Sequence, residues 1–405
     1  MRILILSQYF IPETGAPQGR LLQWAKQLGK KGATVEILTA MPNYPEMKIH
    51  EGYRGKFYVS EEIQGVKTHR AWIYATPGKA LFPRLMNYFS FVFTSLLAGI
   101  FKTGRYDYIF CESPPLFLGI TAWLLKIFKG ARLIFNVSDL WPESAEKLGL
   151  VTNRFLLGAA SSLEGFLYRK SFLITGQTRG IVQNISARFP RKNVLWFKNG
   201  ADVKELESME SDPGLRNRLG FSSADFLLLY AGIIGHAQGL EVLLLAAEKL
   251  RLTPAIKFLI MGSGPEKEKL LRMKEAKALD NVIFLESRPR KEVIPFIHAS
   301  DLAVIPLKRL DLFKGAIPSK IFENLALKKP ILLGVEGEAK ELLIDNGHAG
   351  LAFIPEDPDD LANRVLYLYS HEQERIEFGI NGYNYLLREF NPEIIINEFW
   401  NRINA

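Results

Sequence analysis

The segment 314–335 carries residue types that could bind an anion at the start of a helix. Pro318 suits a first helical turn, and Ser319 is of a type that caps helices. The backbone N–H groups of Ser319, Lys320 and Ile321 would then point out of the helix start without acceptors, beside the Lys320 ammonium. Such an arrangement favours an anion such as a diphosphate.

Carboxylates complete the set of candidate chemical groups. Glu323 lies one turn inside the same helix, where it could accept two hydrogen bonds from a vicinal diol such as a ribose. A capped surface helix with a solvated lysine and glutamate would show the same pattern. Asp139 closes a strand at its carboxyl end, from which it could face a cleft or cap the following helix. Glu112 and Ser113 close the preceding strand and are weaker candidates.

Two series of alternating strands and helices must position these groups. The second series starts afresh at Asp225, with six short apolar strands, and the linker lies within 199–223, where Asp, Ser, Pro and Gly accumulate. Repeated βα units predict an α/β fold with two doubly wound parallel sheets. We expect domains at 1–200 and 201–384, with a final helix (385–405) returning to the first. The cleft between two such domains is the default binding site.

Composition and charge constrain the class of protein. Residues 1–200 hold 26 Lys and Arg against 12 Asp and Glu, whereas the remainder holds 25 against 31. The single cysteine, Cys111, excludes a disulfide framework and favours a cytoplasmic location. The chain enters a strand-like run at once, which argues against a signal peptide. There is no Asp-x-Asp and no His/Asp pair at ligand spacing, so no metal site is expected.

The first half contains long apolar segments with cations beside them. Residues 85–101 carry no charge and mix aromatic with aliphatic side chains, which is typical of a helix lying at a bilayer surface. A buried helix packed on a parallel sheet would look similar. The cations beside these segments are Lys79, Arg84, Lys102, Arg105, Lys126, Lys129 and Arg132. We expect the N-terminal domain to bind an anionic membrane surface. No nucleic-acid recognition motif is present, so nucleic acid is not an expected partner.

Several motifs together resemble one family. The segments are NGAD (199–202), AGIIGHAQGLEVLLLAAEKL (231–250), IMGSGPEKEKL (260–270), DLAVIPL (301–307) and the helix that carries Glu323. Together they resemble the GT-B glycosyltransferases of family 4, which retain the anomeric configuration of the sugar. PSKIFE, FNVSDLWPES and the pair Gln238–Gly239 are most similar to the WbuB-like branch, whose members transfer N-acetylated deoxyamino sugars such as N-acetylfucosamine.

The resemblance implies a function. A UDP-sugar would lie on the C-terminal domain and the acceptor on the N-terminal one, with neither a cofactor nor a metal. The apolar, basic first half favours an acceptor saccharide linked to a polyprenyl diphosphate. The pathway would be synthesis of O-antigen, capsule or another surface polysaccharide, at the inner face of the cytoplasmic membrane.

The resemblance also assigns roles to residues. The expected donor-binding residues are Gly15, Ala16, Gly232, Gly235, His236, Gly262, Arg288, Gly315, Ala316, Ile317, Pro318, Ser319, Lys320, Ile321 and Glu323. The expected catalytic residues are Asp139, Glu323 and Lys320. Asp139 would orient the sugar or receive the acceptor's proton. His236 would contact a sugar or phosphate rather than a metal.

The sequence departs from the family pattern at the donor site. Gly315 stands where the family has the first of two glutamates, and Ile233 and Gln238 stand where it has two cations. Ala16 replaces a second glycine in the first loop. We expect the lost charge to be supplied from neighbouring loops. The substitutes are Lys320 with Arg288, Arg290, Lys308, Arg309 and Lys314.

Other protein classes fit the same architecture. A sugar-nucleotide 2-epimerase would convert a UDP-sugar without an acceptor. The missing glutamate and cations would also suit a non-catalytic membrane-binding scaffold. A nicotinamide dehydrogenase is remote, because the first βα loop lacks Gly-x-Gly-x-x-Gly.

Overall fold

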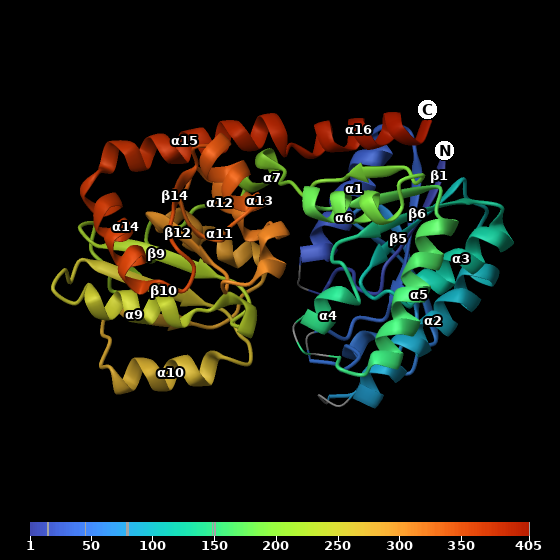
Figure 1. Cartoon of the computed structure of the whole chain (residues 1–405), viewed down its shortest axis with the longest axis horizontal. Helices are drawn as coiled ribbons and strands as arrows, with labels where there is room; N and C mark the ends of the chain where they lie inside the picture. Colours follow the sequence, from blue (N-terminus) through green and yellow to red (C-terminus); the bar gives the residue numbers. More distant parts are fainter. Residues whose placement is uncertain (14–15, 45, 78–80, 148, 150, 405) are drawn as a thin grey trace. The chain divides into compact units, whose positions relative to one another are not determined.

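The chain folds into two compact units in a computed structural model (Figure 1). The structure describes residues 1–13, 16–44, 46–77, 81–147, 149 and 151–404. The first domain comprises Met1–Asn199 with Pro392–Ala405, and the second comprises Gly200–Asn391. The returning segment therefore begins at 392 rather than at the predicted 385, because residues 385–389 still belong to a helix that packs on the second domain.

The first domain is built on an eight-stranded sheet. Its strands are β1 (Arg2–Leu6), β2 (Thr34–Ala40), β3 (Tyr58–Ile63), β4 (Val66–Ala71), β5 (Tyr108–Ser113), β6 (Arg132–Val137), β7 (Leu173–Gly176) and β8 (Val194–Trp196). Its helices are α1 (Ala16–Lys30), α2 (Leu81–Lys102), α3 (Leu118–Lys129), α4 (Glu143–Lys147), α5 (Arg154–Lys170), α6 (Arg179–Arg188) and α16 (Pro392–Asn404). The strand order is β3-β4-β2-β1-β5-β6-β7-β8.

All strand pairs in this sheet are parallel except β3–β4. β3 lies antiparallel to β4 at one edge of the sheet. This edge strand alternates partly buried with exposed residues and carries polar side chains, so it lacks the continuous apolar run that reveals a central strand.

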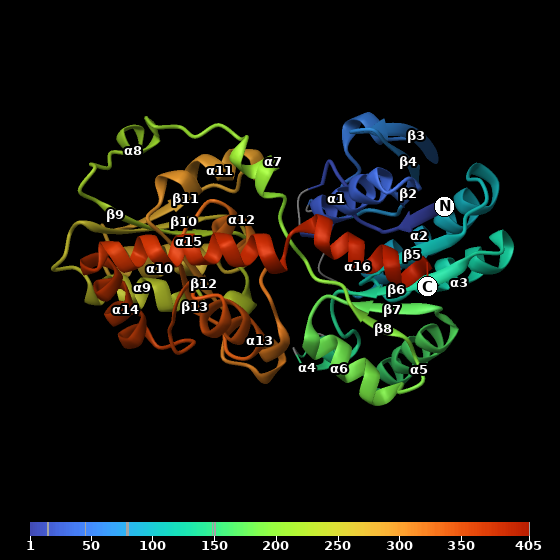
Figure 2. The ribbon, with the colours of Figure 1, turned by 90° about the horizontal axis from the view of Figure 1, so that it is seen from above.

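Helices cover both faces of the first sheet. Leu4 and Leu6 of β1 join a core with α2, α3 and α5, whereas Ile3 and Ile5 join a core with α1 and α16. Figure 2 shows α16 over this sheet beside α1. The Tyr108 hydroxyl donates to the Ile403 carbonyl at 2.6 Å. The predicted return of the final helix is therefore confirmed.

The second domain contains a six-stranded, wholly parallel sheet in the order β11-β10-β9-β12-β13-β14. Its strands are β9 (Phe226–Ala231), β10 (Ile256–Met261), β11 (Val282–Leu285), β12 (Leu302–Pro306), β13 (Ile331–Gly334) and β14 (Gly350–Ala352). Its helices are α7 (Val203–Glu207), α8 (Leu215–Arg218), α9 (Glu241–Lys249), α10 (Lys267–Ala276), α11 (Arg290–Ala299), α12 (Lys320–Ala326), α13 (Glu338–Lys340), α14 (Pro358–Ser370) and α15 (Glu372–Glu389).

The six strands predicted for the second domain are present, and the predicted fold class is confirmed. The strands form because short apolar runs are buried on both faces between helices, as β9, β12 and β13 illustrate. Parallel strands end at one edge of a sheet. The turns after β9, β10 and β11 and the loop after β12 therefore all emerge at the same edge of the second domain.

Candidate functional site

Two glycine turns pack backbone against backbone at the carboxyl edge of the second sheet. A Cβ at Gly262 would lie 1.9 Å from the Gly232 oxygen, and one at Gly264 would lie 2.2 Å from the Ile234 oxygen. Ile234 N–H also donates to the Ser263 carbonyl at 2.9 Å. Only glycine permits this approach, so the turns after β9 and β10 form one tightly joined surface.

Lys320, the first residue of α12, reaches this surface. Its Nζ lies 3.9 Å from the centroid of the Tyr230 ring. A Cβ at Gly232 would come within 2.8 Å of the same Nζ, so the glycine leaves room for the ammonium. Lys320 has no carboxylate partner within 4.0 Å among the described residues. Withdrawal from water lowers the pKa of Lys320 to about 7.

The start of α12 differs in detail from the prediction. The helix begins at Lys320 rather than Pro318, and the Ser319 side chain makes no capping hydrogen bond. Ser319 already has helical dihedrals, whereas a capping residue is normally extended. Ile321 N–H donates to the Pro318 carbonyl at 3.1 Å, so the prediction of three free N–H groups was wrong for Ile321. Within the described chain, the N–H groups of Ser319 and Lys320 have no acceptor.

Glu323 accepts a hydrogen bond from Arg290, the first residue of α11. Arg290 Nε donates to Glu323 Oε1 at 2.5 Å, and Arg290 Nη1 lies 3.7 Å from Glu205 Oε2. Arg290 was expected to face a diphosphate, but its guanidinium is committed to two carboxylates. The expected contact of Glu323 with a ribose stays a prediction.

Three more of the expected cations also have carboxylate partners. The pairs are Arg288–Glu292 at 3.2 Å, Arg309–Glu336 at 3.2 Å and Lys314–Asp311 at 2.7 Å. The partners are Glu292 of α11, Glu336 after β13 and Asp311 in the loop after β12, and the residue types alone do not reveal these pairings. Lys320 differs from all three because its charge is not balanced by a described acidic residue.

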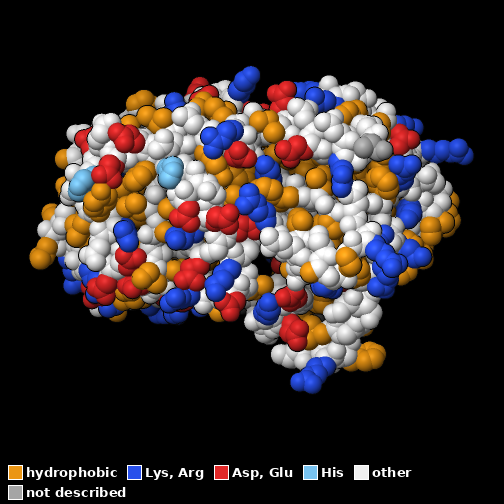
Figure 3. Space-filling view, turned by 45° about the horizontal axis from the view of Figure 1, so that its top comes forward, with side chains coloured by type: hydrophobic (Ala, Val, Ile, Leu, Met, Phe, Trp, Pro, Cys, Tyr) orange, Lys and Arg blue, Asp and Glu red, His pale blue; other side chains and the backbone are white. Residues whose placement is uncertain are grey.

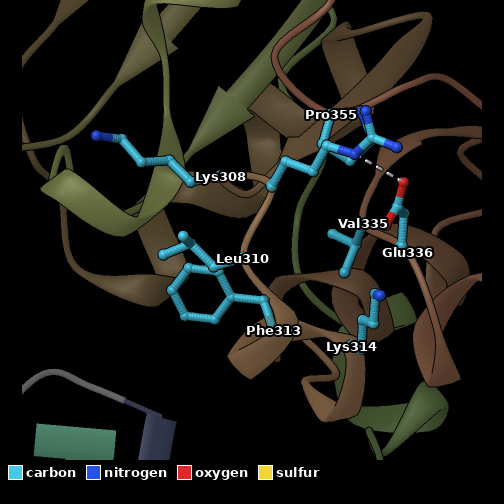
Figure 4. Close-up of a pocket in the computed structure, with 8 residues that line it drawn as sticks. Lys308, Leu310, Phe313, Lys314, Val335, Glu336 and Pro355 are labelled. Carbon is cyan, nitrogen blue, oxygen red and sulfur yellow. Dashed lines mark ion pairs between the residues drawn. The ribbon is translucent and has the colours of Figure 1, made fainter. Parts of the chain in front are cut away.

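A small pocket lies beside the loop that leads to α12. Figure 4 shows Lys308, Leu310, Phe313 and Lys314 from the loop after β12 around it. Glu336, after β13, closes the side where it pairs with an arginine. The next residues along this loop, 315–317, were expected to contact the donor. They are partly buried and lead directly to α12.

His236 and Gly235 lie in the turn after β9. His236 Nδ1 is 2.7 Å from Glu266 Oε1, and its side chain is otherwise exposed. A Cβ at Gly235 would meet Gln238 Oε1 at 2.9 Å. The predicted contact of His236 with a sugar or phosphate stays a prediction.

The carboxyl edge of the first sheet holds a buried network that the sequence did not reveal. Arg20 of α1 donates to Glu112 Oε1 at 2.6 Å, and both side chains are nearly inaccessible. Asn136 Nδ2 donates to Glu112 Oε2 at 2.8 Å, and the Ser138 hydroxyl donates to Oε1. Arg20 precedes the buried Trp24 by one helical turn, and its guanidinium lies over that ring. An arginine within the apolar stripe of a helix was the sequence signal that could have pointed to this buried network.

Asp139 follows β6 at the same edge. The Ser144 hydroxyl donates to Asp139 Oδ2 at 2.8 Å, and burial raises the pKa of the carboxyl. The aspartate is partly buried, so one oxygen is held while the side chain retains access to solvent. Gly15, expected to approach the sugar, lies outside the described residues, and Ala16 is the first residue of α1.

Potential metal ligands do not gather in the described ranges: no group of three His, Cys, Asp or Glu residues could hold an ion there. The chemical resources of the two edges are therefore a buried carboxylate–guanidinium network with Asp139 in the first domain, and an ammonium on a glycine surface in the second.

Comparisons with known proteins extend over nearly the whole chain. Residues 15–200 match the family described as Glycosyl transferase 4-like domain, and residues 211–385 match Glycosyl transferases group 1. The putative colanic acid biosynthesis glycosyl transferase WcaI of Escherichia coli (strain K12) is 27% identical over 341 residues, 81% of each chain.

Solved structures have the same fold. HepE of Anabaena, in complex with UDP and glucose, aligns with a TM-score of 0.72 at 16% identity, over 100% of this chain and 99% of that one. Sucrose-phosphate synthase of Thermosynechococcus elongatus aligns with a TM-score of 0.76 at 16% identity, over 100% and 98%. With both domains matched in order, the chain belongs to the GT-B glycosyltransferases of family 4.

Proposed function

We propose that this glycosyltransferase moves a sugar, with retention and without a metal, from a UDP-sugar to a saccharide linked to a polyprenyl diphosphate. The sugar would be an N-acetylated deoxyamino sugar and the product a precursor of a surface polysaccharide such as O-antigen or capsule. The reaction would take place at the inner face of the cytoplasmic membrane. The named activities of WcaI and of a poly(ribitol-phosphate) N-acetylglucosaminyltransferase of Staphylococcus aureus, 23% identical over 189 residues, support this polysaccharide context.

The observation that carries the donor site is the unbalanced charge of Lys320. A partly buried ammonium without a carboxylate is costly unless an anion joins it. The diphosphate of a nucleotide sugar would supply that anion, against the surface formed by Gly232 and Gly262. UDP bound to a structural neighbour with the same fold agrees with this choice.

The leaving diphosphate gains negative charge as the glycosidic bond breaks. Lys320 and the free N–H groups at the start of α12 would stabilise that charge without a metal. The diphosphate would in turn help to accept the acceptor's proton on the same face of the sugar. Asp139 would position the sugar or acceptor. Glu112 is unsuited to act as a nucleophile because both of its oxygens accept hydrogen bonds.

The membrane contact is assigned to one face of α2. The opposite face, Asn87, Phe91, Ser95 and Ala98, is buried against the first domain. The exposed stripe consists of Met86, Phe89, Phe93, Leu97 and Phe101, with exposed fractions from 41% to 74%. The window 85–102 has a mean hydropathy of 1.3 and is the one described segment long and apolar enough to cross a membrane. Because one face packs on protein, we propose that α2 lies on the bilayer.

The nearby cations support this assignment only in part. Lys126 donates to the Lys170 carbonyl, and Lys129 donates to the carbonyls of Ile100 and Thr103. These ammonium groups therefore satisfy the carboxyl ends of helices. Lys102 and Arg105 follow the apolar stripe and are exposed. On the face drawn in Figure 3, Lys and Arg side chains gather along one edge of the first domain.

A product assay tests the catalytic proposal. UDP- and GDP-sugars are screened with a short-chain prenyl-diphosphate saccharide, and the products are identified by mass. We expect a sugar to be transferred from a UDP-sugar. The transfer should require the acceptor and should continue in the presence of a metal chelator. Conversion of the UDP-sugar without an acceptor would identify an epimerase, and the absence of both UDP binding and turnover would favour a scaffold.

Sedimentation with vesicles tests the membrane contact. Phe93→Ser combined with Phe101→Ser should reduce binding to vesicles that contain anionic lipid by about tenfold or more, because two exposed aromatic side chains no longer enter the bilayer. Leu252→Ser, a 96% exposed leucine of the second domain, is the control. Equal binding by the double variant and the control would refute the assignment.

A further inference from the structure

Arg290 joins two elements of the second domain through one guanidinium. It is the first residue of α11, and its Nε donates to Glu323 Oε1 of α12 at 2.5 Å. Its Nη1 lies 3.7 Å from Glu205 Oε2 of α7. The contact to Glu323 is much the closer of the two, so the guanidinium fixes the position of that carboxylate first.

We propose that Arg290 is a positioning residue that holds Glu323 so that its second oxygen faces the vicinal diol of the donor's ribose. The proposal rests on the proposed function, because it needs a nucleotide at this edge. It adds a residue that the family pattern did not assign and replaces the expectation that Arg290 contacts the diphosphate.

The hydrogen bonds of Glu323 leave one oxygen available. In the described part of the chain Oε1 accepts from Arg290, whereas Oε2 has no donor. An ionised carboxylate accepts hydrogen bonds at both oxygens, and a vicinal diol presents two hydroxyl donors. The side chain of Glu323 is 25% exposed, so it is accessible to a ligand.

The planar guanidinium explains why an arginine serves here. Its donors have a fixed geometry, so a bond through Nε sets the direction of the carboxylate as well as its position. A glutamate held in this way loses less freedom when the diol binds than a mobile one would. Arg290→Gln would remove both the positive charge and the forked set of donors.

A purely structural role is the competing explanation. Arg290 could serve only to tie α7 to α12, much as the Tyr383 hydroxyl ties α15 to Glu207 of α7 at 3.0 Å. Loss of such a tie would reduce stability but would not change which nucleotide the domain prefers. Discrimination between two nucleotides that differ only in the diol therefore separates the two roles.

The experiment is a comparison of UDP with 2′,3′-dideoxy-UDP by calorimetry on the full chain. We expect the wild type to bind UDP about tenfold more tightly than the dideoxy compound, because a hydrogen bond to the charged Glu323 carboxylate contributes about that much affinity. In Arg290→Gln the affinity for UDP should fall about tenfold while that for the dideoxy compound changes little. The preference for the diol would then be lost. Arg290→Lys should recover only part of it.

Two further variants control for stability and for the loss of an arginine. Arg364→Gln removes a similar Nε–carboxylate pair, with Asp360 at 3.2 Å on α14. It should leave the preference unchanged. Glu205→Gln removes the weaker partner of Arg290 and should also retain the preference. If Arg290→Gln keeps the wild-type preference, or if Glu205→Gln loses it equally, the positioning role is refuted.

Failure of the wider assignment gives a different result. A wild type that binds neither nucleotide would overturn the UDP donor and this inference together. A wild type that binds both equally would leave the donor site intact and refute only the role of the Glu323–Arg290 pair. Melting curves recorded for each variant identify any that has lost its fold, and Arg290→Lys then provides the test.

Discussion

The carboxyl edges of the two sheets handle buried charge in opposite ways. In the first domain, Arg20 and Glu112 pair with each other and bond to neighbouring polar groups, with exposed side-chain fractions of 8% and 3%. In the second, Lys320 rests on an aromatic ring and has no described carboxylate beside it. A balanced pair is complete without a ligand. An unbalanced cation is a site that an anion completes.

This difference determines which cations are candidates for binding a diphosphate. From charge alone, a group of cations was predicted to bind the diphosphate. However, Arg288, Arg309 and Lys314 are each neutralised by a neighbouring carboxylate. Exposed pairs of this kind contribute little to stability or binding. Lys308 also has no described carboxylate partner, but Lys320 is the cation that lies against Tyr230 and Gly232 and is withdrawn from water. Variants at both sheet edges test this contrast between balanced and unbalanced charge.

Breaking the balanced pair should unfold the first domain most readily. Glu112→Ala leaves Arg20 buried without its partner, which costs about 3–5 kcal/mol. All six tryptophans of the chain lie in the first domain, so their fluorescence in urea reports on that domain alone. Glu146→Ala, at an exposed position of α4, is the control. Equal urea midpoints for the two variants would show that the network is dispensable.

Removing the unbalanced charge of Lys320 should reduce nucleotide binding without reducing stability. Lys320→Met should weaken UDP binding by roughly 10- to 100-fold, because a charge-assisted contact to phosphate is lost. The thermal stability of the free protein should stay the same or rise, because a desolvated ammonium no longer has to be accommodated. Calorimetry and thermal melts measure the two quantities. A variant that melts earlier yet binds UDP normally would contradict both statements.

Proton uptake should accompany nucleotide binding. Lys320 has its pKa lowered to about 7 in the free protein, and a bound diphosphate raises it by favouring the ammonium. Below pH 7 the lysine is already charged, so affinity is highest there. As pH rises above 7, affinity should fall by up to about tenfold per unit until the pKa of the complex is passed.

The uptake is measured by calorimetry at pH 8 in buffers of different ionisation enthalpy. Lys320→Met serves as the reference, since any proton bound by UDP itself remains in that variant. An unchanged uptake in the variant would remove Lys320 from the explanation.

Loss of a neutralised cation should have the smallest effect. Arg309→Gln breaks an exposed pair with Glu336, so UDP affinity should stay within about threefold of the wild type. The same titration measures it. A loss as large as that of Lys320→Met would mean that Arg309 leaves its partner for the diphosphate, and the contrast between balanced and unbalanced cations would no longer hold.

The sequence predicted the architecture well because its signals are local. Continuous apolar runs such as 3–6 and 226–231 have the composition of buried parallel strands, and Gly232 marks the turn after the second run. The edge strand β3 gives a weaker signal, because its alternating polar residues resemble those of a loop. Likewise, the prediction of a cap at Ser319 depended on residue type, whereas the backbone already turns into the helix at that position.

The candidate site was predictable only in part, because partners distant in sequence decide what a charge does. Lys320 and Gly232 were both named, but their proximity depends on how β9 and α12 pack. Arg290 was counted as a cation, although its role depends on Glu323, 33 positions away. Arg20 and Glu112, 92 positions apart, show the same limit. Residue types are visible in a sequence, whereas charge compensation emerges only from the fold.

The helix α16 determines the order in which the chain can mature. Ile395, Ile396, Phe399 and Ile403 fill one face of the first domain, yet the ribosome makes them after the entire second domain. During synthesis the first domain therefore exposes an apolar surface until α16 has been made, whereas the second domain can already bury its own core. A stop codon placed before residue 392 would leave that surface permanently exposed, so truncated products should aggregate rather than persist as a half-enzyme.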